Sequence, residues 1–122
     1  MNGFHSLEAM WDAFPPVYRA NLLFALGADN EGETRKQAQE FTLEGAMPPE
    51  CPALILHGGR DRIFPVEEAR RSADFAQGEC VIFPEGNHVC NNIPWRYRPL
   101  MADWLAGKLS AIPPPISSID RL

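Results

Sequence analysis

The spacing of apolar and polar residues divides the chain into an amino-terminal part made of helices and a later part in which strands and helices alternate. In the first 45 residues, apolar side chains recur every three or four positions, which is the period of one helix face. Pro15-Pro16 and the polar loop 29–33 interrupt this pattern, because proline ends one helix and can open the next. We therefore predict three short helices, at about residues 6–14, 17–26 and 33–41.

The pattern changes after the proline-rich connector Met47–Pro52. Two short apolar runs follow, Ala53–Leu56 and Cys80–Phe83, and such runs are typical of parallel strands buried on both faces. Between them, a helix is predicted to begin at Pro65 and to end at Gly78. A strand, a helix and a strand within about thirty residues form a βαβ unit, for which a right-handed crossover is expected.

The carboxyl-terminal part is predicted to contain one further helix, at about residues 95–109. Its expected buried side consists of apolar residues at helical spacing: Tyr97, Met101, Trp104, Leu105 and Leu109. Residues 110–122 include three consecutive prolines and are expected to form an extended or disordered tail. With 122 residues, 45% of them hydrophobic and 22% charged, the chain has the size and composition of one globular α/β domain.

Charge and cysteine content narrow the expected partners and location. The net charge is −5 and no basic cluster exceeds Arg70-Arg71, so nucleic acid and anionic membranes are not expected as partners. No apolar run approaches the ~18 residues of a membrane helix, and the first residues lack the pattern of a secretory signal. Three cysteines without a CxxC spacing argue against a disulfide framework, so we predict a cytoplasmic protein.

Two residues whose side chains can take part in proton transfer follow the two predicted strands. Asp61 lies in the loop after the first strand and His88 lies in the loop after the second. Because the carboxyl ends of neighbouring parallel strands meet at one edge, where ligand sites of α/β sheets gather, we expect these side chains to lie together. A carboxylate can keep one imidazole nitrogen protonated and leave the other to accept a proton. The resulting hypothesis is that His88 is a general base oriented by Asp61. The competing interpretations are a surface histidine and a turn or helix-cap aspartate.

The same loops also contain residues that suit two other kinds of site. A nucleophilic Cys90 would need a base in hydrogen-bonding geometry, which a separation of two residues in a loop does not by itself provide, so packing is the favoured role. A metal site would draw on His57, Asp61, His88 and Cys90, but no two of these residues lie four apart on a predicted helix. We predict no metal site.

Aromatic residues are candidates for a substrate pocket. Those in the amino-terminal helices are Trp11, Phe14, Phe24 and Phe41. Helix core is the competing interpretation and is favoured for most of them. Trp95 follows the His88 loop closely and is a better candidate for contact with a site. The expected pocket residues are Trp11, Phe14 and Trp95.

Three segments together carry a family resemblance: PALILHGGRDRIFPVEEARR, FPEGNHVCNN and YRPLMADWL. They resemble the carboxyl-terminal portion of α/β-hydrolases, in particular bacterial serine hydrolases of the dihydroxy-pseudooxynicotine hydrolase and FrsA-like esterase kind. In that family a triad acid follows the penultimate strand in a G-x-x-D turn and the histidine follows the last strand in a G-x-H turn. These positions fall on Asp61 and His88.

The resemblance covers about residues 5–109 and implies a partial α/β-hydrolase fold. It places a helical cap segment at 1–46, a carboxyl-terminal core segment with the βαβ unit and a final helix at 47–109, and a tail at 110–122. The implied activity is hydrolysis of an ester, an amide or an activated C–C bond in a small-molecule substrate, without a cofactor.

One part of the family pattern is missing from the sequence. The nucleophile of such enzymes lies in a G-x-S-x-G elbow, and no such segment occurs in these 122 residues. We therefore expect a truncated chain or a fragment that is inactive alone and whose open sheet edge binds the missing amino-terminal half or a second copy. The alternative is a non-catalytic interaction or regulatory module derived from a hydrolase half.

Overall fold

The computed structural model describes residues 5–111. By its internal contacts the chain divides into two compact units, residues 1–92 and residues 93–122, which are described separately below. The predicted tail lies outside the described part of the chain, apart from Ser110 and Ala111. The predicted division into a cap segment, a core segment and a tail stays a prediction.

The amino-terminal segment is less helical than its apolar spacing suggests. The helix predicted at residues 6–14 is wrong, because this stretch forms turns and one short 3₁₀ helix, η1 (Trp11–Ala13). Its backbone is instead held by a distant segment: the Leu7 amide donates to the Phe41 carbonyl oxygen at 2.9 Å, and the Leu43 amide donates to the His5 carbonyl oxygen at 2.8 Å. This pairing across the chain overrides the local helical pattern.

Two α-helices follow, and both lie close to their predicted positions. Helix α1 (Pro16–Leu26) begins with a proline and ends at Gly27, whose φ of 65° is the left-handed conformation favoured at helix ends. Helix α2 (Glu31–Ala38) begins two residues earlier than predicted, because the Asn30 side chain accepts a hydrogen bond from the Glu33 amide at 2.9 Å and caps the helix there.

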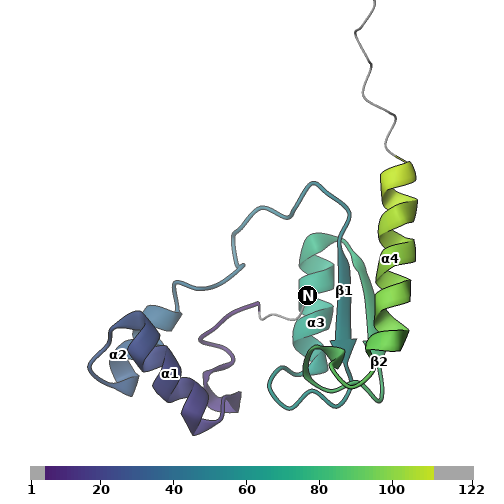
Figure 1. Ribbon diagram of the computed structural model, residues 1–122. Coiled ribbons are helices and arrows are strands. Elements are labelled where there is room, and N and C mark those ends of the chain that lie inside the picture. Colours follow the sequence, from purple (N-terminus) through teal and green to yellow (C-terminus); the bar gives the residue numbers. More distant parts are fainter. Residues whose placement is uncertain (1–4, 112–122) are drawn as a thin grey trace, which may run out of the picture. The chain divides into compact units, whose positions relative to one another are not determined.

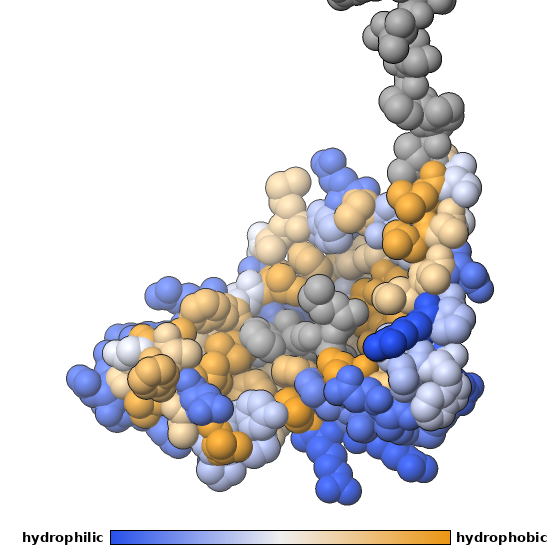
Figure 2. Space-filling model, in the orientation of Figure 1, coloured by the Kyte–Doolittle hydropathy of each residue, from blue (hydrophilic) through white to orange (hydrophobic). Residues whose placement is uncertain are grey.

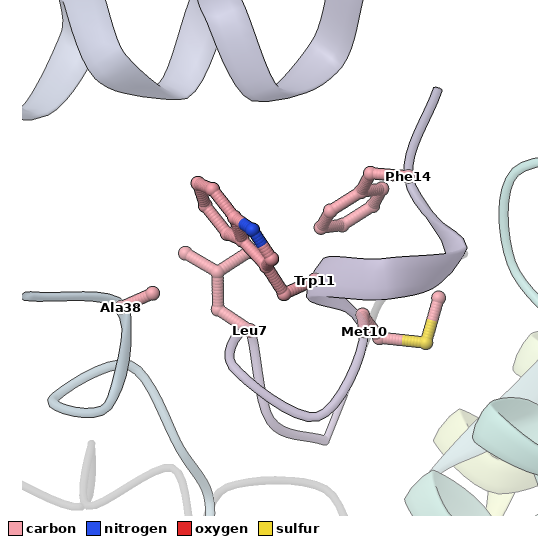
Figure 3. Close-up of a cluster of buried hydrophobic side chains, with 5 residues drawn as sticks. All are labelled: Leu7, Met10, Trp11, Phe14 and Ala38. Atoms are coloured by element: carbon pink, nitrogen blue, oxygen red, sulfur yellow. The ribbon is translucent and has the colours of Figure 1, made fainter. Parts of the chain in front are cut away.

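A small hydrophobic core joins the η1 segment to α2. It consists of five buried side chains: Leu7, Met10, Trp11, Phe14 and Ala38. Figure 3 shows the Trp11 ring beside Leu7 and Phe14, with Ala38 directed toward the same cluster. Ile63 and Phe64, from the loop that carries Asp61, pack against this cluster as partly buried residues. The amino-terminal segment and the Asp61 loop therefore share one core.

The predicted βαβ unit is confirmed. Strand β1 (Leu54–Gly58), helix α3 (Val66–Ala76) and strand β2 (Glu79–Phe83) follow one another, and the two strands pair in parallel. Figure 1 shows the strands side by side with α3 packed against them. Helix α3 turns its small residues to the sheet, since Ala69 and Ala73 are buried. The register places Gly58 opposite Phe83, so both strands end at the same level.

The second unit contains helix α4 (Pro94–Ser110), which matches the predicted fourth helix to within one residue at each end. Pro94 occupies the first turn, where its missing amide hydrogen costs no helical hydrogen bond. The predicted buried side is wrong, because no α4 residue is buried and Met101, Leu105 and Leu109 are exposed. Over residues 5–111, no helix is both long and apolar enough to span a lipid bilayer.

Candidate active site

The loops after β1 and β2 meet at an approach so close that glycine is required. A Cβ atom built on Gly58 would collide with the backbone carbonyl groups of Gly86 and Asn87. A Cβ atom on Gly86 would lie 3.0 Å from the Gly58 Cα and 2.9 Å from the Cys90 Sγ. The two glycines therefore let the second loop lie directly on the end of β1, which brings the residue after Asn87 to the Asp61 loop.

Backbone hydrogen bonds fasten the two loops to each other. The Gly59 amide donates to the Phe83 carbonyl oxygen at 2.7 Å, and the Arg60 amide donates to the Gly86 carbonyl oxygen at 2.8 Å. The first bond continues the parallel ladder by one step, and the second crosses from loop to loop. Because both bonds are short and come from consecutive residues, the position of Asp61 is tied to that of the second loop.

Asp61 is turned inward and its carboxylate is fully buried, with 0% of the side chain exposed. One oxygen, Oδ1, accepts hydrogen bonds from the amides of Ile63 at 2.8 Å and Phe64 at 3.0 Å. The other, Oδ2, lies 3.0 Å from Nδ1 of His88. Burial by itself raises the pKa of the Asp61 carboxyl, but the Phe64 and Ile63 amides and the contact with His88 outweigh it and lower the pKa below its ordinary value. The carboxylate is therefore ionised near neutral pH.

His88 faces Asp61 with one nitrogen, and 37% of its side chain is exposed to solvent. A buried carboxylate accepts hydrogen bonds, so Nδ1–H of His88 donates to Asp61 and Nε2 carries the lone pair. Within residues 5–111, Nε2 of His88 forms no hydrogen bond. The arrangement can accept a proton at Nε2 and stabilise the resulting imidazolium through Asp61.

Phe64 links these groups to the rest of the unit. Its ring centroid lies 5.7 Å from that of His88 and 6.2 Å from that of Phe14. Its amide holds Asp61, and its carbonyl oxygen accepts a hydrogen bond from Nε2–H of His57 at 3.1 Å. Phe64 thus contacts Asp61, His88 and the amino-terminal core.

The loop that carries His88 is strained and is closed by an asparagine pair. Val89 and Cys90 both have left-handed backbone angles, with φ of 51° and 55°, which cost non-glycine residues about 1–2 kcal/mol each. The Asn92 side chain accepts from the Asn87 amide at 2.9 Å and donates to the Glu85 carbonyl oxygen at 2.9 Å. These bonds span the loop from both sides of His88, so they hold the strained residues in place.

The other candidates at these loops lie inside the protein. Cys90 is 2% exposed and packs against Gly86, and burial raises the pKa of its thiol, which opposes formation of a thiolate. His57 is also buried, with Nε2 directed at the Phe64 carbonyl oxygen rather than at His88. In the part of the chain that the structure describes, no group of three or more metal-binding side chains converges.

The aromatic pocket candidates have different positions. Trp11 and Phe14 belong to the small core and are 3% and 6% exposed, so only the Phe14 ring approaches the site, through Phe64. The core role favoured for most of the aromatic set is wrong for Phe24, which is 89% exposed, and for Phe41, which is 47% exposed. Trp95 belongs to α4 in the second unit, and its role in a pocket stays a prediction.

The sequence interpretation missed the polar residues around His88. An open cavity of about 440 Å³ reaches His88 and is lined by Arg60, Arg62, Ile63, Glu85, Asn87, His88 and Asn92. Figure 2 shows hydrophilic side chains gathered over the loops at the carboxyl ends of the two strands. The signal was present in the sequence, since Arg60 and Arg62 flank Asp61 and Asn92 ends the FPEGNHVCNN segment.

Comparison with known proteins connects this geometry to hydrolases. No protein-family model matches the chain. The chain is 29% identical over 114 residues to 2,6-dihydropseudooxynicotine hydrolase of Paenarthrobacter nicotinovorans, covering 89% of this chain and 30% of that enzyme. It also superimposes on the crystal structure of 2,6-dihydroxy-pseudo-oxynicotine hydrolase with a TM-score of 0.75 and 27% identity, covering 89% of this chain and 32% of that one.

These similarities confirm the resemblance noted in the sequence. The chain has a partial α/β-hydrolase fold and corresponds to a carboxyl-terminal, hydrolase-like portion. It spans about a third of the length of the two proteins it matches.

Proposed function

We propose that this chain supplies the acid and the base of a catalytic triad in a serine-type α/β-hydrolase. In this proposal Asp61 is the acid, His88 is the base, and the nucleophile comes from a segment outside these 122 residues, since the sequence contains no G-x-S-x-G elbow. The reaction class is hydrolysis of an ester, an amide or an activated C–C bond in a small molecule.

The observation that carries the proposal is the pairing of a fully buried carboxylate with a partly exposed imidazole. The distance from Nδ1 to Oδ2 is 3.0 Å, and the carboxylate accepts two further hydrogen bonds from backbone amides. Those amides fix the carboxylate, which in turn fixes the ring orientation and the tautomer. A surface histidine needs none of these arrangements. The similarity to a hydrolase over 89% of the chain supports the same conclusion.

The chemistry follows from the positions of the two imidazole nitrogens. Nε2 of His88 takes the proton of the serine hydroxyl as its oxygen attacks the substrate carbonyl carbon. Asp61 stabilises the imidazolium through Nδ1–H, and His88 then delivers the proton to the leaving group. In the second half of the reaction His88 activates a water molecule that releases the acyl group from the serine.

The proposal is tested by joining the chain to an α/β-hydrolase segment that carries a nucleophilic serine and assaying a panel of p-nitrophenyl esters. We expect His88→Ala to lower kcat by about 10⁴-fold or more, and Asp61→Asn to lower it on a similar scale. A loss below about tenfold for His88→Ala would remove His88 from the mechanism. Imidazole nitrogen NMR of the chain alone gives a second readout, because Asp61→Asn should abolish the preference for Nδ1–H.

A second proposal concerns the partner of the sheet. Over the described residues, β1 and β2 pair only with each other, so each strand has an open edge. We propose that one edge binds the nucleophile-bearing half of the hydrolase, or a second copy of this chain when that half is absent. A non-catalytic interaction module would use the same edge. The predicted cytoplasmic location stays a prediction.

A further inference from the structure

Two arginines lie beside the proposed base in the same open cavity. Arg60 and Arg62 line the cavity of about 440 Å³ that reaches His88. Among the residues that the structure describes, the other ionisable side chains in its lining are Glu85 and His88, so two positive charges and one carboxylate share the cavity. The local charge of this lining is therefore positive, whereas the whole chain carries a net charge of −5.

Among the described residues, no carboxylate neutralises either of these arginines. Over residues 5–111, neither Arg60 nor Arg62 forms an ion pair, although other arginines of the same unit, Arg35 and Arg71, pair with acids. Asp61 lies between them in sequence, but both of its oxygens are engaged by the Ile63 and Phe64 amides and by His88. Over residues 5–111, the carboxylate nearest in sequence therefore forms no ion pair with either guanidinium group.

Backbone hydrogen bonds fix the main-chain positions of Arg60 and Arg62 relative to His88. The Arg60 amide donates to the Gly86 carbonyl oxygen at 2.8 Å, which ties Arg60 to the His88 loop. Arg62 lies inside the turn that Asp61 closes by accepting from Ile63 at 2.8 Å. Only the side chains themselves must be ordered when an anion binds, which limits the entropic cost of binding.

From this arrangement we propose that Arg60 and Arg62 select substrates that carry a carboxylate group near the bond to be hydrolysed. A guanidinium presents two parallel N–H donors that match the two oxygens of a carboxylate, and the match gives direction as well as charge. The inference rests on the proposed function, because it assigns His88 to the reacting bond and the arginines to a group that does not react.

The experiment uses the chain itself and measures binding rather than hydrolysis. Monomethyl glutarate and dimethyl glutarate share one carbon skeleton and differ by one carboxylate. NMR titration of each into the chain follows the arginine Nε–H signals and the His88 ring signals. We expect the half-ester to bind about fivefold more tightly than the diester, which is the scale of one or two exposed ion pairs, and added salt to reduce the difference.

Substitution assigns the preference to this cavity. The double variant Arg60→Gln with Arg62→Gln should bind both esters equally. Arg70→Gln removes one positive charge from an exposed position of α3, outside the cavity, and should keep the preference of the parent chain. The proposal is overturned by equal affinities in the parent chain, by the absence of a saturable shift, or by a preference that survives in the double variant.

The two proposals fail in different ways. His88→Ala leaves both arginines in place, so it should abolish hydrolysis in the complemented protein while the half-ester preference persists. If hydrolysis depends on His88 but the chain shows no half-ester preference, the triad assignment holds and the arginine assignment is wrong.

Discussion

Gly58 lies directly beneath the carbonyl oxygen of Asn87, the residue that precedes His88, with no room for a side chain between them. This contact joins the end of β1 to the loop of the proposed base. The short distance between Asp61 and His88 therefore requires that residue 58 have no Cβ atom.

Gly58→Ala should separate the two loops and disrupt the pair. The new methyl group collides with backbone carbonyl groups, which cannot rotate away as a side chain can. We expect the free energy of unfolding to fall by about 1–3 kcal/mol, the usual cost of overpacking, and the His88 Nδ1–H signal to weaken in proton NMR. Gly107→Ala is the matched control, because a Cβ on this helical glycine meets nothing within 4 Å and alanine favours helix. A Gly58→Ala protein as stable as the parent would contradict this account.

Asn92→Ala should loosen the His88 loop without touching His88. It removes the hydrogen bonds from the Asn87 amide and to the Glu85 carbonyl oxygen, each 2.9 Å long. We expect the free energy of unfolding to fall by about 1–2 kcal/mol and hydrogen exchange at the Asn87 amide to become faster. Asn91→Ala removes the same kind of side chain from the neighbouring exposed position and should leave exchange at Asn87 unchanged. Similar exchange rates in the two variants would show that Asn92 does not close the loop.

Val89→Gly should relieve backbone strain. Val89 has a φ of 51°, which a β-branched residue adopts at a cost, and its side chain is 39% exposed, so little packing is lost. We expect the free energy of unfolding to stay constant or to rise by up to about 1 kcal/mol. Val17→Gly, in a helix with a side chain 61% exposed, should instead lower stability by a few tenths to about 1 kcal/mol. If Val89→Gly were the more harmful change, residue 89 would not be strained. Urea denaturation of both variants measures the comparison.

The Asp61 carboxylate predicts how stability depends on pH. Its pKa is lower in the folded chain than its ordinary value, so folding favours the ionised form. The resulting stability is present above the unfolded pKa, near 3.9, and is lost as the pH falls through the lower folded-state pKa. The stability difference between the parent chain and Asp61→Asn should therefore shrink as the pH is lowered from about 5 to about 2. Chemical denaturation of both proteins across this pH range measures the difference. A stability difference that grows on acidification would contradict the prediction.

The open edges of the sheet predict self-association of the chain on its own. Within residues 5–111, β1 and β2 have no other strand to pair with, and unpaired strand edges readily bind further strands. Size-exclusion chromatography with light scattering should show a mass that increases with concentration. A chain that stays monomeric at high concentration and unfolds in one cooperative step would contradict this expectation.

The sequence was most informative where structure is decided locally. Proline before β1 and α3, continuous apolar runs and glycine-containing turns are short-range signals, and they located the βαβ unit and the loops of Asp61 and His88. The helix expected at residues 6–14 was wrong because the competing partners, the backbone of residues 41–43, are distant in sequence. The early start of α2 was a missed local signal, since Asn30 and Glu33 form a recognisable cap.

The polar surroundings of His88 were harder to predict from the sequence than the pairing of His88 with Asp61. The positions of Arg60, Arg62 and Asn92 next to the candidate pair were visible, but their roles depend on which way each side chain points. Exposed Phe24 illustrates the same difficulty, because helical spacing of apolar residues does not reveal whether another element covers them.

The position of Phe64 restricts how the protein can evolve. One ring is in contact with both Phe14 and His88, so a change in the amino-terminal core at Phe14 reaches the imidazole through a single neighbour. Substitutions that enlarge or shrink residue 14 will need compensating changes at residue 64 before the imidazole regains its orientation. Variation in the amino-terminal core and the orientation of His88 are therefore coupled through a single side chain.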